Sequence, residues 1–96
     1  MTQTGKNDTF EAIAHSMVEL YKRKNADYGD AFGRSVEKYG LIAALTRISD
    51  KFNRIESLIL KNENQVKSEG LEDSLIDMAC YCIMTLIEMG YNPDSK

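Results

Sequence analysis

The stretch that decides the fold is residues 71–89, which read LEDSLIDMACYCIMTLIEM. At about 100° per residue, its apolar side chains fall on two nearly opposite faces of a helix. A helix that is apolar on two sides is expected to be buried on two sides. The sequence therefore predicts a central helix of an all-α protein. One face holds Leu71, Leu75, Met78, Cys82, Leu86 and Met89, and the other holds Ile76, Cys80, Ile83, Met84 and Ile87.

An acidic stripe interrupts this apolar helix. Asp73 and Asp77 are four residues apart, so they lie one turn above each other. Crowded carboxylates that lose water are costly unless a cation compensates them, and oxygen ligands suit Mg²⁺ or Mn²⁺. Glu69 extends the stripe if the helix starts early enough, and Glu72 flanks it. The alternative is that the acidic residues near the start favour the positive end of the helix, which does not account for Asp77.

The rest of the chain predicts two further main helices and a short helical turn. Asp8 and Glu11 resemble a capping box that starts the first helix, Gly40 breaks the chain before a long helix, and Gly90 suits the end of the last one. No stretch alternates as a strand does. The expected elements are a helix over 8–24, a loop over 25–33, a helical turn over 35–39, a helix over 41–60, a polar linker over 61–70 and the helix over 71–89.

The long helix carries a packing seam whose spacing alternates between four and three residues. A chain of 96 residues buries only roughly 60–65% of its unfolded surface, so this much apolar surface predicts a partner subunit. We expect a flexible N-terminus over 1–9, a single domain over 10–90 and a tail over 91–96. The expected fold is an all-α bundle of three main helices and a short helical turn, completed by oligomerisation. The seam residues are Leu41, Leu45, Ile48, Phe52, Ile55 and Ile59.

Composition narrows the classes of function. The net charge of −3 and the pI near 5.1 argue against a protein that coats nucleic acid, so no direct nucleic-acid partner is expected. The longest apolar run is far short of the roughly 20 residues that span a bilayer, and the N-terminus has no hydrophobic signal core. We therefore expect a cytoplasmic protein that does not contact a membrane.

A polar sector of the long helix lies opposite the seam and contains Arg47, Asp50 and Arg54. Asp50 and Arg54 have the spacing of an i,i+4 ion pair. In a functional reading, Asp50 is a further metal ligand, and Lys51 and Arg54 neutralise phosphate oxygens. The alternative is a solvated face with one weak pair.

The segment after the first helix, residues 22–33, offers groups for a nucleotide. Lys24 can meet phosphate, Tyr28 or Phe32 can stack on a base, and Asn25 or Asp27 can read a sugar hydroxyl or a base edge. The alternative is a helix end followed by an ordinary turn, with the aromatic side chains in the core.

Three blocks of sequence resemble the nucleotide modification associated domain 1 family, which is found in phages and bacteria. The blocks are KNADYGD at 24–30, RISDKFNRI at 47–55 and LEDSLIDMACY at 71–81. The similarity extends from about residue 10 to residue 89. This family is in turn similar, more distantly, to the all-α NTP pyrophosphatases, which include MazG-like and dimeric dUTPase-like enzymes.

Those enzymes hold Mg²⁺ with acidic residues from two adjacent helices, cleave a nucleoside triphosphate to monophosphate and pyrophosphate, and assemble as dimers or tetramers. The resemblance implies that Asp50, Asp73 and Asp77 face each other around a metal ion. The chain departs from the E-E-x-x-E and E-x-x-D patterns of the enzymes. Its first acidic helix offers Asp50 and Glu56, and Ser74 stands where the glutamate of E-x-x-D aligns.

The resulting hypothesis is a Mg²⁺- or Mn²⁺-dependent hydrolase of a (deoxy)nucleoside triphosphate that works as a homodimer or homotetramer. Metal would be held by Asp50, Asp73 and Asp77, and Glu69 or Glu72 would activate water, with Lys51 as a further catalytic residue. The alternatives are a non-catalytic nucleotide-binding module, and a structural oligomerisation domain in which Asp73 and Asp77 pair with arginines of a neighbouring helix. The substrate-binding residues would be Lys24, Asn25, Asp27, Tyr28, Arg47 and Arg54.

Overall fold

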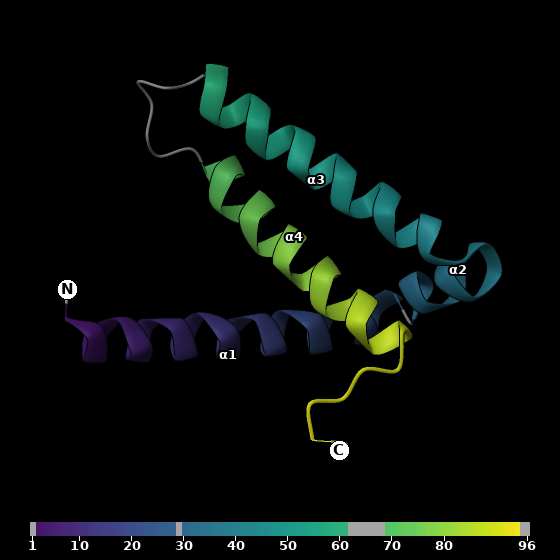
Figure 1. Cartoon of the computed structure of the whole chain (residues 1–96), viewed down its shortest axis with the longest axis horizontal. Helices are drawn as coiled ribbons and strands as arrows, with labels where there is room; N and C mark the ends of the chain where they lie inside the picture. Colours follow the sequence, from purple (N-terminus) through teal and green to yellow (C-terminus); the bar gives the residue numbers. More distant parts are fainter. Residues whose placement is uncertain (1, 29, 62–68, 95–96) are drawn as a thin grey trace. The chain divides into compact units, whose positions relative to one another are not determined.

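The computed structural model describes residues 2–28, 30–61 and 69–94, except for the side chains of 27, 28 and 69. These residues form four α-helices and no strand, so the all-α prediction is confirmed (Figure 1). None of the described helices is long and apolar enough to cross a bilayer. The helices are α1 (Gln3–Tyr28), α2 (Ala31–Tyr39), α3 (Leu41–Lys61) and α4 (Glu69–Glu88).

The chain divides into two compact units, Met1–Asp30 and Ala31–Lys96. The first contains α1, and the second contains α2, α3 and α4. The single domain predicted over residues 10–90 stays a prediction.

Helix α1 is longer at both ends than the sequence predicts. It begins at Gln3 because Thr2 caps it: the Thr2 hydroxyl accepts a hydrogen bond from the backbone N–H of Gly5 at 3.0 Å. The predicted start at Asp8 is therefore wrong. No glycine or proline occurs over residues 6–28, so nothing in the backbone stops the helix at Lys24. The loop predicted over residues 25–33 is accordingly wrong over residues 25–28, which are helical.

Helix α2 closes one end of the second unit with a small apolar core. Phe32 and Val36 are one turn apart, so they share the face of α2 that packs against Ala44 of α3. Tyr81 and Met84 of α4 pack against the same cluster. The predicted loop is thus also wrong at Phe32, which is buried in a helix. Burial leaves the Phe32 ring in the core, as the alternative expected of the aromatic side chains, and not free to stack on a base.

The turn between α2 and α3 depends on Gly40. This residue has a φ of 80°, a left-handed conformation that glycine adopts without steric cost. Its N–H donates to the carbonyl oxygen of Val36 at 2.7 Å, and its own carbonyl accepts from the N–H of Ala43 at 3.1 Å. The predicted break at Gly40 is confirmed.

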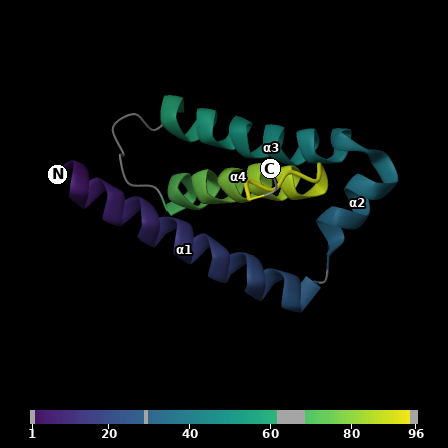
Figure 2. The same cartoon turned by 60° about the horizontal axis from the view of Figure 1, so that its bottom comes forward.

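Helices α3 and α4 form an antiparallel hairpin and lie side by side in both views of the chain (Figures 1 and 2). Ile55 of the predicted α3 seam is buried at 7% exposure, whereas Leu45 is 58% exposed and Phe52 is 51% exposed. On α4, Leu75 and Ile83 also remain about half exposed, at 47% and 48%. The predicted burial of α4 on two sides is therefore not reached within the second unit.

Helix α4 ends as the sequence predicts. Gly90 has a φ of 80° and donates its N–H to the carbonyl oxygen of Ile87 at 3.0 Å. The N–H of Tyr91 donates to the carbonyl oxygen of Leu86, also at 3.0 Å. These two bonds form a Schellman motif, which satisfies carbonyl groups that the last turn leaves without partners.

We expect Gly40→Ala to lower the free energy of unfolding by about 1–2 kcal/mol, because a Cβ atom strains a left-handed backbone even where space is open. Circular dichroism during thermal unfolding measures the loss. Gly40→Asn is the control, since asparagine tolerates this conformation better, and it should lose less than alanine does. An alanine variant that melts at the wild-type temperature would contradict this account of the turn.

Candidate functional site

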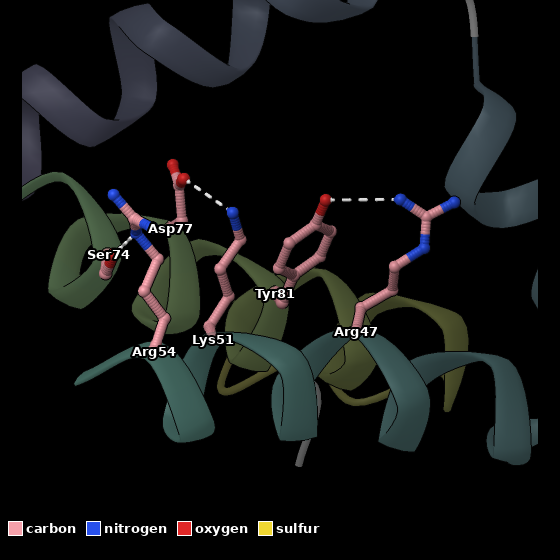
Figure 3. Close-up of polar contacts among 6 residues, drawn as sticks. All are labelled: Arg47, Lys51, Arg54, Ser74, Asp77 and Tyr81. Carbon is pink, nitrogen blue, oxygen red and sulfur yellow. Dashed lines mark hydrogen bonds and ion pairs between the residues drawn. The ribbon is translucent and has the colours of Figure 1, made fainter. Parts of the chain in front are cut away.

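One side of the α3–α4 hairpin carries six of the twelve residues that the sequence predicts for the site. We call this side the polar face. Figure 3 shows Arg47, Lys51, Asp77 and Tyr81 pointing to the same side of the two ribbons, with Arg54 turned towards Ser74. Helical periodicity places Asp50 beside Arg47 and Arg54, and Asp73 beside Asp77. The polar face therefore consists of Arg47, Asp50, Lys51 and Arg54 from α3, and of Asp73, Ser74, Asp77 and Tyr81 from α4.

Three contacts join α3 to α4 across this face, and they share one antiparallel register. The pairs are Arg47 with Tyr81, Lys51 with Asp77, and Arg54 with Ser74. Each step of four and then three residues forward along α3 is matched by an equal step backward along α4. Residues with this spacing lie on one side of a helix, so the contacts form a ladder along the hairpin.

The middle contact is an ion pair. Lys51 Nζ lies 3.1 Å from Asp77 Oδ2, and the two side chains are 30% and 28% exposed. A partly exposed pair of this kind contributes modestly to stability. The structural alternative pairs Asp77 with an arginine of a neighbouring helix. In this hairpin the partner of Asp77 is a lysine, Lys51.

Arg54 makes the second contact. Its Nε–H donates to Ser74 Oγ at 3.1 Å, and Ser74 is only 2% exposed. Within the described residues, Arg54 does not form the ion pair that the sequence predicts with Asp50. A hydrogen bond to a buried hydroxyl across the hairpin outweighs a solvent-exposed i,i+4 pair, which is worth only about 0.3–0.5 kcal/mol.

The third contact links the polar face to the core. Arg47 Nη1 donates to the Tyr81 hydroxyl at a long 3.5 Å. The Tyr81 ring packs against Phe32 with a centroid distance of 5.6 Å and an interplanar angle of 38°. Tyr81 therefore touches α2 with its ring and α3 with its hydroxyl group, and it places Arg47 relative to the core.

The three predicted metal ligands lie on the polar face, but they do not converge within the described residues. Asp50 and Asp73 are exposed on different helices, and Asp77 is paired with Lys51. No group of three or more His, Cys, Asp or Glu side chains in the described part of the chain is close enough to hold a metal ion. Mg²⁺ commonly binds through one or two carboxylates together with substrate phosphates and waters. Asp73 and Asp77, which are neighbours on α4, would by themselves meet that number of carboxylates.

Of the other predicted site residues, Glu72 lies away from this face, and the rest belong to the first unit or have side chains outside the described residues. Glu72 is exposed on α4 and lies two residues before Ser74, about 200° around the helix from it. Glu69 begins α4, but its side chain is outside the described residues. Lys24 is exposed and Asn25 is half-buried on α1, in the first unit. The side chains of Asp27 and Tyr28 are again outside the described residues.

Sequence reasoning missed Ser74 and Tyr81 as members of the site. A signal for both was present, because Ser74, Asp77 and Tyr81 have the i, i+3, i+7 spacing of a single helix face. The same spacing relates Arg47, Lys51 and Arg54 as i, i+4, i+7 on α3. Matching the two series in antiparallel order would have found the ladder.

We expect Asp77→Asn to cost less than about 1 kcal/mol of unfolding free energy without ligand, because the lost ion pair is partly exposed. Asp73→Asn is the matched control and should change stability by at most about 0.5 kcal/mol, since Asp73 is exposed. Urea unfolding measures both. A loss well above about 2 kcal/mol for Asp77→Asn would assign the pair a mainly structural role.

Comparison with known proteins identifies the family. No curated protein matches the chain, and no solved structure matches it. The family model described as Nucleotide modification associated domain 1 matches residues 24–89, which include all of the polar face. The match covers more than half of the 96 residues. The chain belongs to the nucleotide modification associated domain 1 family.

Proposed function

We propose that the polar face binds a (deoxy)nucleoside triphosphate together with Mg²⁺ or Mn²⁺ and hydrolyses it to monophosphate and pyrophosphate. The observation that carries the proposal is the row of Arg47, Lys51 and Arg54 on one side of the hairpin, with the Asp77 carboxylate beside Lys51. Helical periodicity adds Asp50 and Asp73 next to this row. The family description supports a nucleotide as the ligand. The likeness to all-α NTP pyrophosphatases supports the reaction.

The cations of α3 suit a chain of phosphates. Arg47 and Arg54 are seven residues apart, which is about 10 Å along the helix axis, and Lys51 lies between them. Arginine offers a planar fork for two phosphate oxygens, and lysine offers a compact point charge. The row would therefore bind the triphosphate and neutralise charge that develops on it.

The carboxylates would hold the metal ion. Asp73 and Asp77 lie on one turn of α4, with Asp50 on α3, and Asp77 already accepts a cation in the form of Lys51. A bound Mg²⁺ or Mn²⁺ would withdraw charge from phosphate oxygens and make water more acidic.

The chain's residues would direct the hydrolysis itself. Water oxygen bonds to the α-phosphorus, the bond from that phosphorus to the bridging oxygen breaks, and pyrophosphate leaves. Lys51 would neutralise phosphate charge as this bond breaks. The proton from water would pass to a carboxylate. Of the two predicted bases, Glu69 and Glu72, the proposal keeps Glu69, because Glu72 lies away from the polar face.

One observation favours a second candidate, a nucleotide-binding module without catalysis. Lys51 neutralises Asp77, so the carboxylate that would serve as the deepest metal ligand already has a partner. The row of cations needs no metal to attract phosphate. In either case we place the protein in the cytoplasm, in nucleotide-pool or phage nucleotide-modification metabolism.

We also propose that a second copy of the chain covers the apolar side chains that α3 and α4 leave exposed, giving a homodimer or homotetramer. Leu45, Phe52 and Ile59 follow one another at seven-residue spacing, and each is at least half exposed. Repetition at this interval is typical of helices that pack against another helix. If the third hypothesis holds, in which the chain is a purely structural oligomerisation domain, this assembly would be its only function.

The activity is tested by incubating the protein with Mg²⁺ and a panel of ribo- and deoxyribonucleoside triphosphates. We expect pyrophosphate and monophosphate to appear and the melting temperature to rise with at least one of them. Lys51→Met should weaken triphosphate binding about tenfold, because it removes one charge-assisted contact.

The matched control is Lys38→Met, which removes a lysine of α2 that lies over the Tyr39 ring and should leave binding unchanged. Stabilisation without pyrophosphate release would favour the binding module. Neither hydrolysis nor stabilisation by any triphosphate would refute both candidates.

The assembly is tested by sedimentation equilibrium. We expect the wild type to be dimeric or tetrameric, and Phe52→Asp to dissociate it, because burying a phenylalanine contributes about 1.5–3 kcal/mol. Asn53→Asp places the same charge about 100° around α3 and serves as the control, with assembly retained. A wild type that sediments as a monomer at all concentrations would exclude the second copy.

A further inference from the structure

We propose that Ser74 is a positioning residue that holds Arg54 with its two terminal nitrogens presented to a phosphate group. The inference rests on the proposed function, because it describes how one cation of the polar face meets the triphosphate. It adds to that function a residue with no charge and no direct contact with the ligand.

The first observation is the contrast in exposure between the two partners. Ser74 is 2% exposed, whereas Arg54 is exposed at the surface of α3. A buried hydroxyl group needs a hydrogen-bond partner, and none of the buried polar side-chain atoms that the structure describes lacks one. The Nε–H of Arg54 supplies that partner for Ser74 at 3.1 Å. Arg54 is thus tied to a fixed point through Nε, although the residue as a whole is exposed.

The second observation is which nitrogen of Arg54 makes this bond. A guanidinium group carries five N–H donors, one on Nε and four on the two terminal nitrogens. Ser74 uses Nε, as Figure 3 shows, so the edge formed by Nη1 and Nη2 stays available for two oxygens of one phosphate. Because serine is neutral, the hydrogen bond orients the guanidinium group without offsetting its charge.

The neighbouring contact works differently. Asp77 also fixes a cation of α3, but it offsets the charge of Lys51 at the same time. Arg47 also has a neutral partner, the Tyr81 hydroxyl, but it uses a terminal nitrogen for a long bond of 3.5 Å. Arg54 is held through Nε by a shorter bond, so it keeps both terminal nitrogens and its full charge for an anion. Arginine has many rotamers, and one that is ordered before binding loses less entropy when phosphate arrives.

The test measures the affinity for inorganic tripolyphosphate in the presence of Mg²⁺ by isothermal titration calorimetry. Ser74→Ala should weaken binding roughly five- to tenfold, because Arg54 then keeps its charge but loses its orientation. Ser49→Ala is the matched control, since Ser49 is an exposed serine about 200° around α3 from Arg47, and it should bind as the wild type does. Circular dichroism checks that each variant retains its helices.

A double-mutant cycle separates positioning from a general structural effect. In an Arg54→Ala background, Ser74→Ala should cause no further loss of affinity, because its effect acts through Arg54. In an Arg54→Lys background it should again cause none, since lysine has no Nε–H to orient. An equal loss in all three backgrounds, or no loss in the wild-type background, would overturn the role of Ser74.

The proposed hydrolysis can fail separately from this inference. If the wild type binds tripolyphosphate but releases no pyrophosphate from nucleotides, the catalytic proposal is refuted. The double-mutant cycle still decides the role of Ser74 in that case. A wild type that binds neither tripolyphosphate nor any nucleotide overturns both.

Discussion

The ion pair between Lys51 and Asp77 lies at the centre of a register on which the rest of the second unit depends. If α4 turned by one residue against α3, its side chains would rotate by about 100°. Asp77 would leave Lys51, Ser74 would leave Arg54, and Tyr81 would leave both Arg47 and Phe32. Each polar contact is weak by itself, so apolar packing provides most of the stability. The ladder distinguishes the observed register from its neighbours, because only this one satisfies all three contacts together.

The sequence was sufficient to predict helices that have a periodic apolar pattern and end at a glycine. Gly40 and Gly90 stop helices through their left-handed backbone, a local property that can be predicted without a structure. The region around Phe32 could not be predicted in this way. Two glycines and several turn-forming residues favour a loop there, yet burial of Phe32 against Tyr81 and Ala44 places it in a helix. Packing between distant residues overrode local preference.

The same distinction explains what was predicted of the site. Arg47, Lys51 and Arg54 were found because their charges interrupt an apolar pattern on a single helix. Their partners depend on how α4 lies against α3, which periodicity within one helix cannot fix. Local spacing therefore predicted an ion pair between Asp50 and Arg54. In the hairpin, Arg54 instead forms a hydrogen bond with Ser74, and Asp77 forms an ion pair with Lys51. The apolar residues show the complementary limit. Spacing identifies a packing seam, but it does not say whether the same chain or another copy covers it.

The charge pattern of the polar face bears on what it can bind. The polar face carries three cations and three carboxylates. The carboxylates repel an anion that binds without a metal ion, and the cations repel a metal ion that binds without an anion. Each ligand alone would therefore be attracted by one set of charges and repelled by the other. In the proposed complex, a triphosphate that carries a divalent ion would offer both signs at once: the cations of α3 would hold its phosphates, and Asp73 and Asp77 would hold its metal. In that arrangement Lys51 can exchange Asp77 for a phosphate oxygen, and neither charge is left without a partner. A metal–nucleotide complex would thus suit this mixed-charge surface better than either component alone, which is the reason for proposing the complex as the ligand.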